Sequence, residues 1–181
     1  MFSRSTNVIL LLAVLAAVLG GIVQHRRQAP PEESAESTLV GKPLPALILP
    51  DLEGRAHALS DYRGRRLLIN FWASWCGPCL KEMPALNQAQ EKFGGQGAIV
   101  LGIAMDEPTR VRAFLRAHPV SYPILLGRIE PPSTSLQLGD KREILPFSVL
   151  VDAAGRIIAT HAGVLSRPQL EQWLAPATTP P

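Results

Sequence analysis

Short apolar runs alternate with apolar residues at helical spacing in the middle of the chain. Residues 67–72 and 98–104 are nearly continuously apolar, which is typical of strands covered on both faces. Between them, apolar positions from Pro78 onward recur at helical spacing until Gly94 and Gly95. A strand, a helix and a second strand of these lengths predict a right-handed crossover between parallel strands.

The pattern continues with a helix, a hairpin and a final helix. Residues 109–117 have helical spacing, and we expect this helix to be capped by Thr109 or by a residue just before it. Residues 147–151 and 156–160 flank a turn signal and predict paired strands. Ser166 predicts the N-cap of the last helix.

The sequence divides into four parts. We expect a membrane anchor or signal segment at residues 1–24, a flexible linker at 25–38, a folded domain at 39–175 and a disordered tail at 176–181. The linker is rich in Pro, Glu and Ser, and the tail has little apolar surface to bury. Within the domain, residues 46–49 and 55–59 flank a turn and predict an added N-terminal hairpin.

The apolar segment from Val8 to Val23 has no charge, no amide and no proline. It is shorter than the roughly 20 residues of an untilted membrane span and longer than the roughly 7–15 residues of a signal-peptide centre. No clear Ala-x-Ala site follows it, which favours an uncleaved anchor over a cleaved signal. Its flanking arginines are balanced, so the positive-inside rule leaves its orientation undecided.

Composition argues for one globular domain and against a nucleic-acid partner. The chain of 181 residues is 46% apolar and 18% charged, which suits a single domain with a short extra segment. Its net charge is +3, and its basic residues are scattered apart from Arg63, Arg65 and Arg66. No basic tract could follow a phosphate backbone. We expect the domain to be a monomer.

The two cysteines form a Cys-x-x-Cys motif where a strand turns into a helix. The amino end of a helix stabilises negative charge on a nearby sulfur, so Cys76 is the expected nucleophile. Cys79, one turn further into the helix, is placed to attack a mixed disulfide formed by Cys76.

Other uses of the cysteine pair are weaker. A disulfide closing so short a loop constrains the unfolded chain little, and a zinc site would lack a second pair of ligands. A copper site would need Met83, which is more typical of core packing. We therefore expect no metal site.

Three segments carry a resemblance to a known family. NFWASWCGPCLKEMPAL (residues 70–86), LSDYRG (59–64) and LPFSVLVDAAGRIIATHAG (145–163) resemble the membrane-anchored bacterial TlpA/ResA/DsbE group of the thioredoxin superfamily. The resemblance implies an α/β thioredoxin fold, a central mixed sheet flanked by helices, with the added hairpin. It implies thiol:disulfide oxidoreductase activity, with no cofactor beyond the Cys76–Cys79 disulfide. It also implies that Pro146 is a cis-proline facing the cysteines and that Leu145 offers its backbone to an extended substrate.

Two positions refine the predicted site. Asn70 stands where thioredoxin has a buried aspartate, and Glu82, three residues after Cys79, resembles a glutamate of the anchored reductases. A buried Glu82 would have a raised pKa and could deprotonate Cys79, whereas the alternative is a solvated glutamate paired with Lys81 or Arg65.

We expect Trp72 to pack in the core and Trp75 to contact substrate. Gly77 and Pro78, between the two cysteines, complete the expected substrate-binding residues.

Together these features predict a tethered reductase of protein disulfides, with its domain in the bacterial periplasm or on the outer face of the membrane. The resemblance implies a transmembrane electron donor of the DsbD type and substrates met in cytochrome c maturation or oxidase assembly. A disulfide oxidant or isomerase, and a copper metallochaperone using the same cysteines, are the alternatives. The Gly77–Pro78 dipeptide argues against the first of these.

Overall fold

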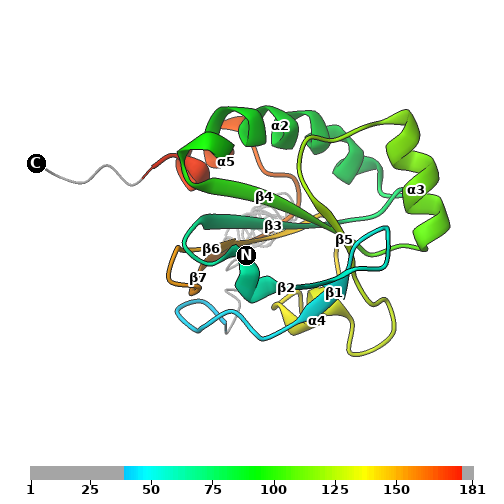
Figure 1. Cartoon of the computed structure of the whole chain (residues 1–181), viewed down its shortest axis with the longest axis horizontal. Helices are drawn as coiled ribbons and strands as arrows, with labels where there is room; N and C mark the ends of the chain where they lie inside the picture. Colours follow the sequence, from blue (N-terminus) through cyan, green and yellow to red (C-terminus); the bar gives the residue numbers. More distant parts are fainter. Residues whose placement is uncertain (1–38, 177–181) are drawn as a thin grey trace, which may run out of the picture. The chain divides into compact units, whose positions relative to one another are not determined.

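The computed structural model describes residues 39–176, which are built around a five-stranded mixed sheet (Figure 1). The strand order is β5-β4-β3-β6-β7, with β3 in the middle. β3 (Arg66–Trp72) runs parallel to β4 (Ala98–Ala104) and antiparallel to β6 (Phe147–Val151). The edges are β5 (Ile124–Leu126), parallel to β4, and β7 (Ile157–Ala162), antiparallel to β6. This arrangement confirms the predicted thioredoxin fold.

α2 (Gly77–Phe93) and α5 (Arg167–Leu174) cover one face of the sheet, and the N-terminal hairpin and α4 (Thr134–Gln137) lie on the other (Figure 1). On the face with α2 and α5, Leu86 of α2 and Leu170 of α5 pack with Leu68 of β3. On the other face, Leu49 and Leu59 join the core that contains Ile69 and Leu101. The remaining elements are β1 (Ile48–Pro50), β2 (Ala56–Ala58), η1 (Leu59–Tyr62), η2 (Gly94–Gln96) and α3 (Pro108–Ala117).

Local sequence explains where two of the helices begin. In α5, the Ser166 side chain accepts from the Gln169 N–H while the Gln169 side chain bonds back to Ser166, so the predicted N-cap is confirmed as a capping box. For α3, the cap is not Thr109 itself but a residue just before it, which the prediction also allowed. Glu107 is the N-cap, without a side-chain bond, and Pro108 fills the first turn, where its fixed φ suits the helix.

Four elements were absent from the sequence prediction, namely β5, α4 and the short 3₁₀ helices η1 and η2. β5 has only three residues and forms its ladder with Gly102 to Ala104 of β4, so a long-range contact rather than a local pattern defines it. α4 is a single turn capped by Ser133. The N-terminal hairpin is confirmed, with shorter strands than expected.

Within residues 39–176, no helix has the length and hydropathy needed to cross a membrane. The predicted anchor at 1–24, including the segment from Val8 to Val23, lies outside the described residues. So do the linker at 25–38 and all of the predicted tail except Pro176.

Gly102 of β4 is a tightly enclosed position, which yields a test of the packing. A Cβ there would lie 2.5 Å from Ile124 Cδ1 and 3.2 Å from both Trp72 Nε1 and Tyr122 Cε2. We expect Gly102→Ala to lower the free energy of unfolding by about 1–3 kcal/mol, measured by urea denaturation.

The matched control is Gly95→Ala, because a Cβ at exposed Gly95 meets nothing within 4 Å. It should change the free energy of unfolding by no more than about 0.5 kcal/mol. Equal midpoints for Gly102→Ala and the unsubstituted protein would show that this interface is not closely packed.

Candidate active site

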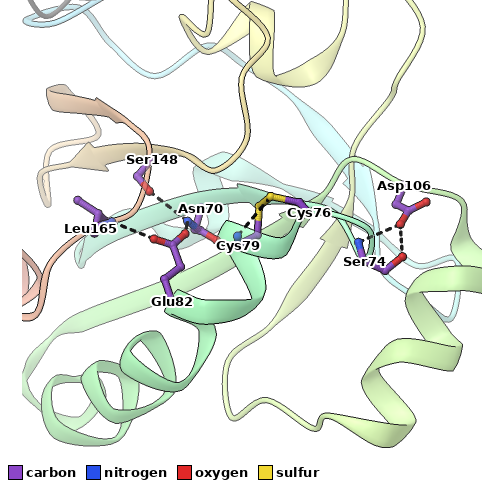
Figure 2. Close-up of a disulfide and its surroundings, with 8 residues drawn as sticks. All are labelled: Asn70, Ser74, Cys76, Cys79, Glu82, Asp106, Ser148 and Leu165. Atoms are coloured by element: carbon purple, nitrogen blue, oxygen red, sulfur yellow. Dashed lines mark hydrogen bonds between the residues drawn. A yellow bond between two sulfur atoms is a disulfide. The ribbon is translucent and has the colours of Figure 1, made fainter.

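The cysteine pair lies at the edge of the sheet where β3 ends and α2 begins. Cys76 and Cys79 form a disulfide, with Cα atoms 5.3 Å apart (Figure 2). The exposed fraction is 4% for Cys76 and 0% for Cys79. Cys76 is therefore the sulfur nearer to solvent, as its predicted role as the attacking group requires.

Cys76 is also the N-cap of α2. Its Sγ accepts a hydrogen bond from the Cys79 N–H at 3.3 Å, and Pro78 occupies the first turn. The amino end of this 17-residue helix carries partial positive charge, which stabilises a thiolate at Cys76 once the disulfide is reduced.

Exposed residues surround the buried disulfide. Trp75 is 66% exposed, and Gly77 and Pro78 are exposed beside it. Trp72, in contrast, is fully buried, and the centroid of its ring lies 5.4 Å from that of the Phe114 ring. The predicted core position of Trp72 is thus confirmed. Trp75, Gly77 and Pro78 are therefore exposed residues directly beside the disulfide.

The loop before β6 forms a further side of the site. The Leu145–Pro146 bond is cis, as the resemblance implied. The half-buried Leu145 side chain packs against the apolar cluster that contains both cysteines. Among the described residues, the backbone N–H and C=O of Leu145 have no hydrogen-bond partner, whereas the Pro146 carbonyl accepts from Gly163.

Glu82 is buried on the face of α2 that also carries Cys79. Its exposed fraction is 2%. Oε1 accepts from Asn70 Nδ2 at 2.7 Å and Oε2 accepts from the Leu165 N–H at 2.9 Å (Figure 2). Burial raises the pKa of Glu82, against the opposing effect of these two hydrogen bonds. The alternative of a solvated glutamate paired with Lys81 or Arg65 is wrong, because the carboxylate points into the domain.

Asn70 connects this carboxylate to the centre of the sheet. Besides Glu82, its amide donates to Ser148 Oγ at 3.1 Å. Nearby, burial raises the pKa of the Tyr122 hydroxyl, and the charge of Glu82 adds to the rise. The sequence prediction missed Ser148 and Leu165. A polar Ser148 inside the buried strand FSVLV was the available signal, whereas Leu165 contributes only its backbone.

A second acidic residue holds the segment that leads into Cys76. Buried Asp106 accepts from the N–H and the hydroxyl of Ser74, at 3.0 and 2.5 Å (Figure 2). It also accepts from the Glu107 N–H at 2.8 Å. These bonds join the end of β4 to the loop after β3. Asp106 was not among the predicted site residues, although a carboxylate two residues after a buried strand was a usable sign.

The described residues offer few metal ligands near the cysteines. Between residues 39 and 176, no three His, Cys, Asp or Glu side chains are grouped so that they could hold a metal ion. Met83 is 6% exposed and packs in the apolar cluster with Trp72.

Comparisons with known proteins agree with this geometry. The family model of AhpC/TSA matches residues 40–160. The thiol-disulfide oxidoreductase ResA of Geobacillus thermodenitrificans is 33% identical over 136 residues, which are 75% of this chain and 76% of that protein. ResA of Bacillus thuringiensis subsp. konkukian is 31% identical over 176 residues, 95% of each chain.

Solved structures show the same fold. A thiol:disulfide interchange protein DsbE from Chlorobium tepidum is 29% identical with a TM-score of 0.64, covering 72% of this chain and 92% of its own. StoA from Bacillus subtilis, 22% identical with a TM-score of 0.57, covers 71% of this chain and 96% of its own and supports the fold alone. With its Cys-x-x-Cys disulfide at the start of α2, the chain belongs to the AhpC/TSA family and, within the thioredoxin superfamily, to the TlpA/ResA/DsbE-like thiol–disulfide oxidoreductases.

Proposed function

We propose that this oxidoreductase works as a membrane-tethered reductase of disulfides in partner proteins. The observation that carries the proposal is the buried Glu82 carboxylate behind a Cys76–Cys79 pair at a helix amino end. Such a site suits thiol–disulfide exchange, in which a thiolate attacks and a second thiol must lose its proton to finish the reaction.

The reaction starts from the dithiol form. The Cys76 thiolate attacks one sulfur of the substrate disulfide, so that a mixed disulfide forms and the other substrate sulfur leaves as a thiolate. Cys79 then gives its proton to Glu82 and attacks Cys76 Sγ, which forms the Cys76–Cys79 disulfide and releases the second substrate sulfur. The substrate gains two electrons, and a donor must return two electrons to the protein.

Glu82 is suited to the proton transfer by its surroundings. A carboxylate with an ordinary pKa is a weak base near neutral pH, whereas burial brings the pKa of Glu82 closer to that of a thiol. Asn70 and the Leu165 N–H hold both of its oxygens, so the carboxylate keeps one orientation on the Cys79 face of α2.

The exposed residues around the disulfide suit an extended protein segment. Trp75, Gly77 and Pro78 would contact the substrate chain next to its cysteine. The backbone of Leu145, before the cis-Pro146 bond, has a donor and an acceptor that an extended strand could use.

The tether and the cellular setting are part of the proposal. The apolar segment from Val8 to Val23 supports an anchor, and the match to ResA over 95% of this chain extends into that part. We place the domain in the periplasm or on the outer face of the bacterial inner membrane, where disulfides persist. A transmembrane donor of the DsbD type would reduce it, and its substrates would include proteins of cytochrome c maturation or oxidase assembly. The domain would act as a monomer without a cofactor.

The opposite direction of electron flow remains the second candidate. A protein disulfide isomerase from Bacteroides thetaiotaomicron shares the fold, with 26% identity and a TM-score of 0.63 over 77% of this chain. An isomerase or oxidant would use the same two sulfurs.

The roles of the two cysteines can be separated by substitution. We expect Cys79→Ser to accumulate a mixed disulfide with a disulfide-containing protein, because the resolving thiol is lost while Cys76 still attacks. Cys76→Ser should accumulate none, since Cys79 is fully buried. Non-reducing electrophoresis and mass spectrometry identify the adduct. Equal adducts for both variants would contradict the assigned roles.

The role of Glu82 can be measured with dithionitrobenzoate, which reports each attack separately. Attack by Cys76 releases a first thionitrobenzoate, and resolution by Cys79 releases the second. We expect Glu82→Gln to slow the second release about 100-fold and to leave the first nearly unchanged, since general base catalysis contributes at least this much. The matched control is Glu91→Gln, an exposed glutamate on the same helix, which should leave both releases unchanged.

The pH dependence of the second release follows from the raised pKa of Glu82. Glu82 accepts a proton only when ionised, so the rate should rise as pH increases through its pKa, above the ordinary carboxyl range. The Glu82→Gln variant should lack this step. A second release that is equally fast in the variant, with the same pH profile, would exclude Glu82 as the base.

A further inference from the structure

The end of the domain opposite the disulfide carries a cluster of basic side chains. β3 and β4 both begin at this end, where Arg66 pairs with Ala98, and both finish near the disulfide, where Trp72 pairs with Ala104. We call Lys42, Arg63, Arg65, Arg66 and Arg156 the basic pole.

Three chain segments bring these residues together. Pro43 forms a β-bridge with Arg156, whose guanidinium donates to the Gly41 carbonyl. The Gly64 N–H donates to the Ala153 carbonyl, and the Arg63 side chain lies over Gly155. The basic pole is therefore one continuous surface made by residues 41–43, 63–66 and 152–157.

Little negative charge balances this surface. Asp152 is the acidic residue of these three segments, and one of its oxygens accepts from the Arg156 N–H. Lys42, Arg63 and Arg65 are exposed and, among the described residues, take part in no ion pair. Arg66 is half-buried and donates to the carbonyls of Trp173 and Ala175. The pole thus presents a positive excess to its surroundings.

We propose that the basic pole docks on anionic phospholipid headgroups of the membrane that holds the chain. This rests on the proposed tether. Residue 39, where the described domain begins, is three positions before Lys42, so the chain from the apolar segment enters the domain at this pole. The 15 residues between Val23 and residue 39 can span at most about 50 Å, which allows the pole to reach the lipid surface. Within about 10 Å of that surface, basic side chains are attracted to anionic lipids.

Docking at this pole would set the direction in which the active site faces. The disulfide lies at the other end of β3, about 20 Å away for a seven-residue strand. Trp75 and the Gly77–Pro78 turn would then point away from the lipid, toward soluble partner proteins. A tether alone would leave the domain free to rotate.

The test uses the full chain reconstituted in vesicles of phosphatidylcholine alone or mixed with phosphatidylglycerol. A nitroxide is attached through a genetically encoded ketone at Ala154, an exposed residue in the turn at the basic pole, so that the cysteines stay unlabelled. A control label at Thr109 lies on exposed α3, which begins at the disulfide end of the sheet. Electron paramagnetic resonance measures how often a water-soluble nickel complex collides with each label.

We expect the collision rate at Ala154 to fall several-fold in vesicles that contain phosphatidylglycerol, with no change at Thr109. At about 1 M salt, where the screening length is about 3 Å, the difference should disappear. The double substitution Arg63→Gln and Arg65→Gln should abolish this fall in the collision rate, which we call protection of the label. The matched control, Arg110→Gln with Arg116→Gln, removes the same charge from exposed positions of α3 and should retain it.

Three other results would each overturn the proposal. Equal collision rates at Ala154 in both kinds of vesicle would exclude docking on anionic lipid. The collision rate at Ala154 could instead be low in both kinds of vesicle and rise when Glu32, Glu33 and Glu36 are changed to Gln. This result would show that the acidic segment before the domain covers the pole. Loss of protection in the α3 control would show that only net charge matters.

Two further measurements show whether the proposed tether or the proposed exchange chemistry is wrong, independently of lipid docking. Flotation of the chain with vesicles of phosphatidylcholine alone reports the tether without any contribution from lipid charge. If the chain does not float, the tether is wrong and the docking proposal is overturned with it. Adduct formation by Cys79→Ser in the same vesicles reports the exchange chemistry independently of both.

Discussion

A carboxylate held out of water behind a cysteine pair is the constraint on which this site depends. Glu82 belongs to α2, and its two oxygens are bound by Asn70 of β3 and by the backbone of Leu165, ahead of α5. Burying an ionisable group is unfavourable unless its polar atoms are paired, so these elements must keep their positions for Glu82 to stay buried. Asn70 in turn bonds Ser148 of β6, which extends the constraint across the sheet.

The same packing orients the sulfur atoms. Cys79 is buried because it shares the inward face of α2 with Glu82, whereas Cys76 occupies the capping position and meets the solvent side. Asp106 bonds Ser74 in the loop before Cys76, and Leu145, in the loop before β6, packs against the cysteine cluster. The site thus combines the Cys76 sulfur at the rim with the Cys79 sulfur and a buried carboxylate beneath it.

Much of this arrangement was visible in the sequence because local patterns encode it. The apolar runs of β3 and β4, the helical spacing of α2 and the capping Ser166 all gave elements within about one residue of those observed, inside the usual scatter of element ends. The Cys-x-x-Cys motif located the site because it falls at a strand-to-helix junction.

The rest depends on contacts between distant residues. β5 exists because residues 124–126 pair with β4, and no periodicity marks so short a strand. From the sequence, Glu82 could have been either buried or solvated. Its partner Leu165 is 83 positions away and donates only a backbone N–H, which any residue other than proline would supply. The end of the sheet where Arg63, Arg65 and Arg156 meet is likewise formed by tertiary contacts. The sequence alone showed the short group of Arg63, Arg65 and Arg66 but not that Arg156 joins it.

The reduction potential of the cysteine pair decides the direction of electron flow, and a redox titration measures it. The Cys76–Cys79 disulfide of the full chain is equilibrated with thiol buffers of known potential, and the reduced fraction is counted by thiol labelling. If the protein is a reductase, we expect a potential near the value of about −270 mV known for thioredoxin, or lower. A potential near about −120 mV, typical of a strong disulfide oxidant, would contradict a reductase role and make the protein a donor of disulfides.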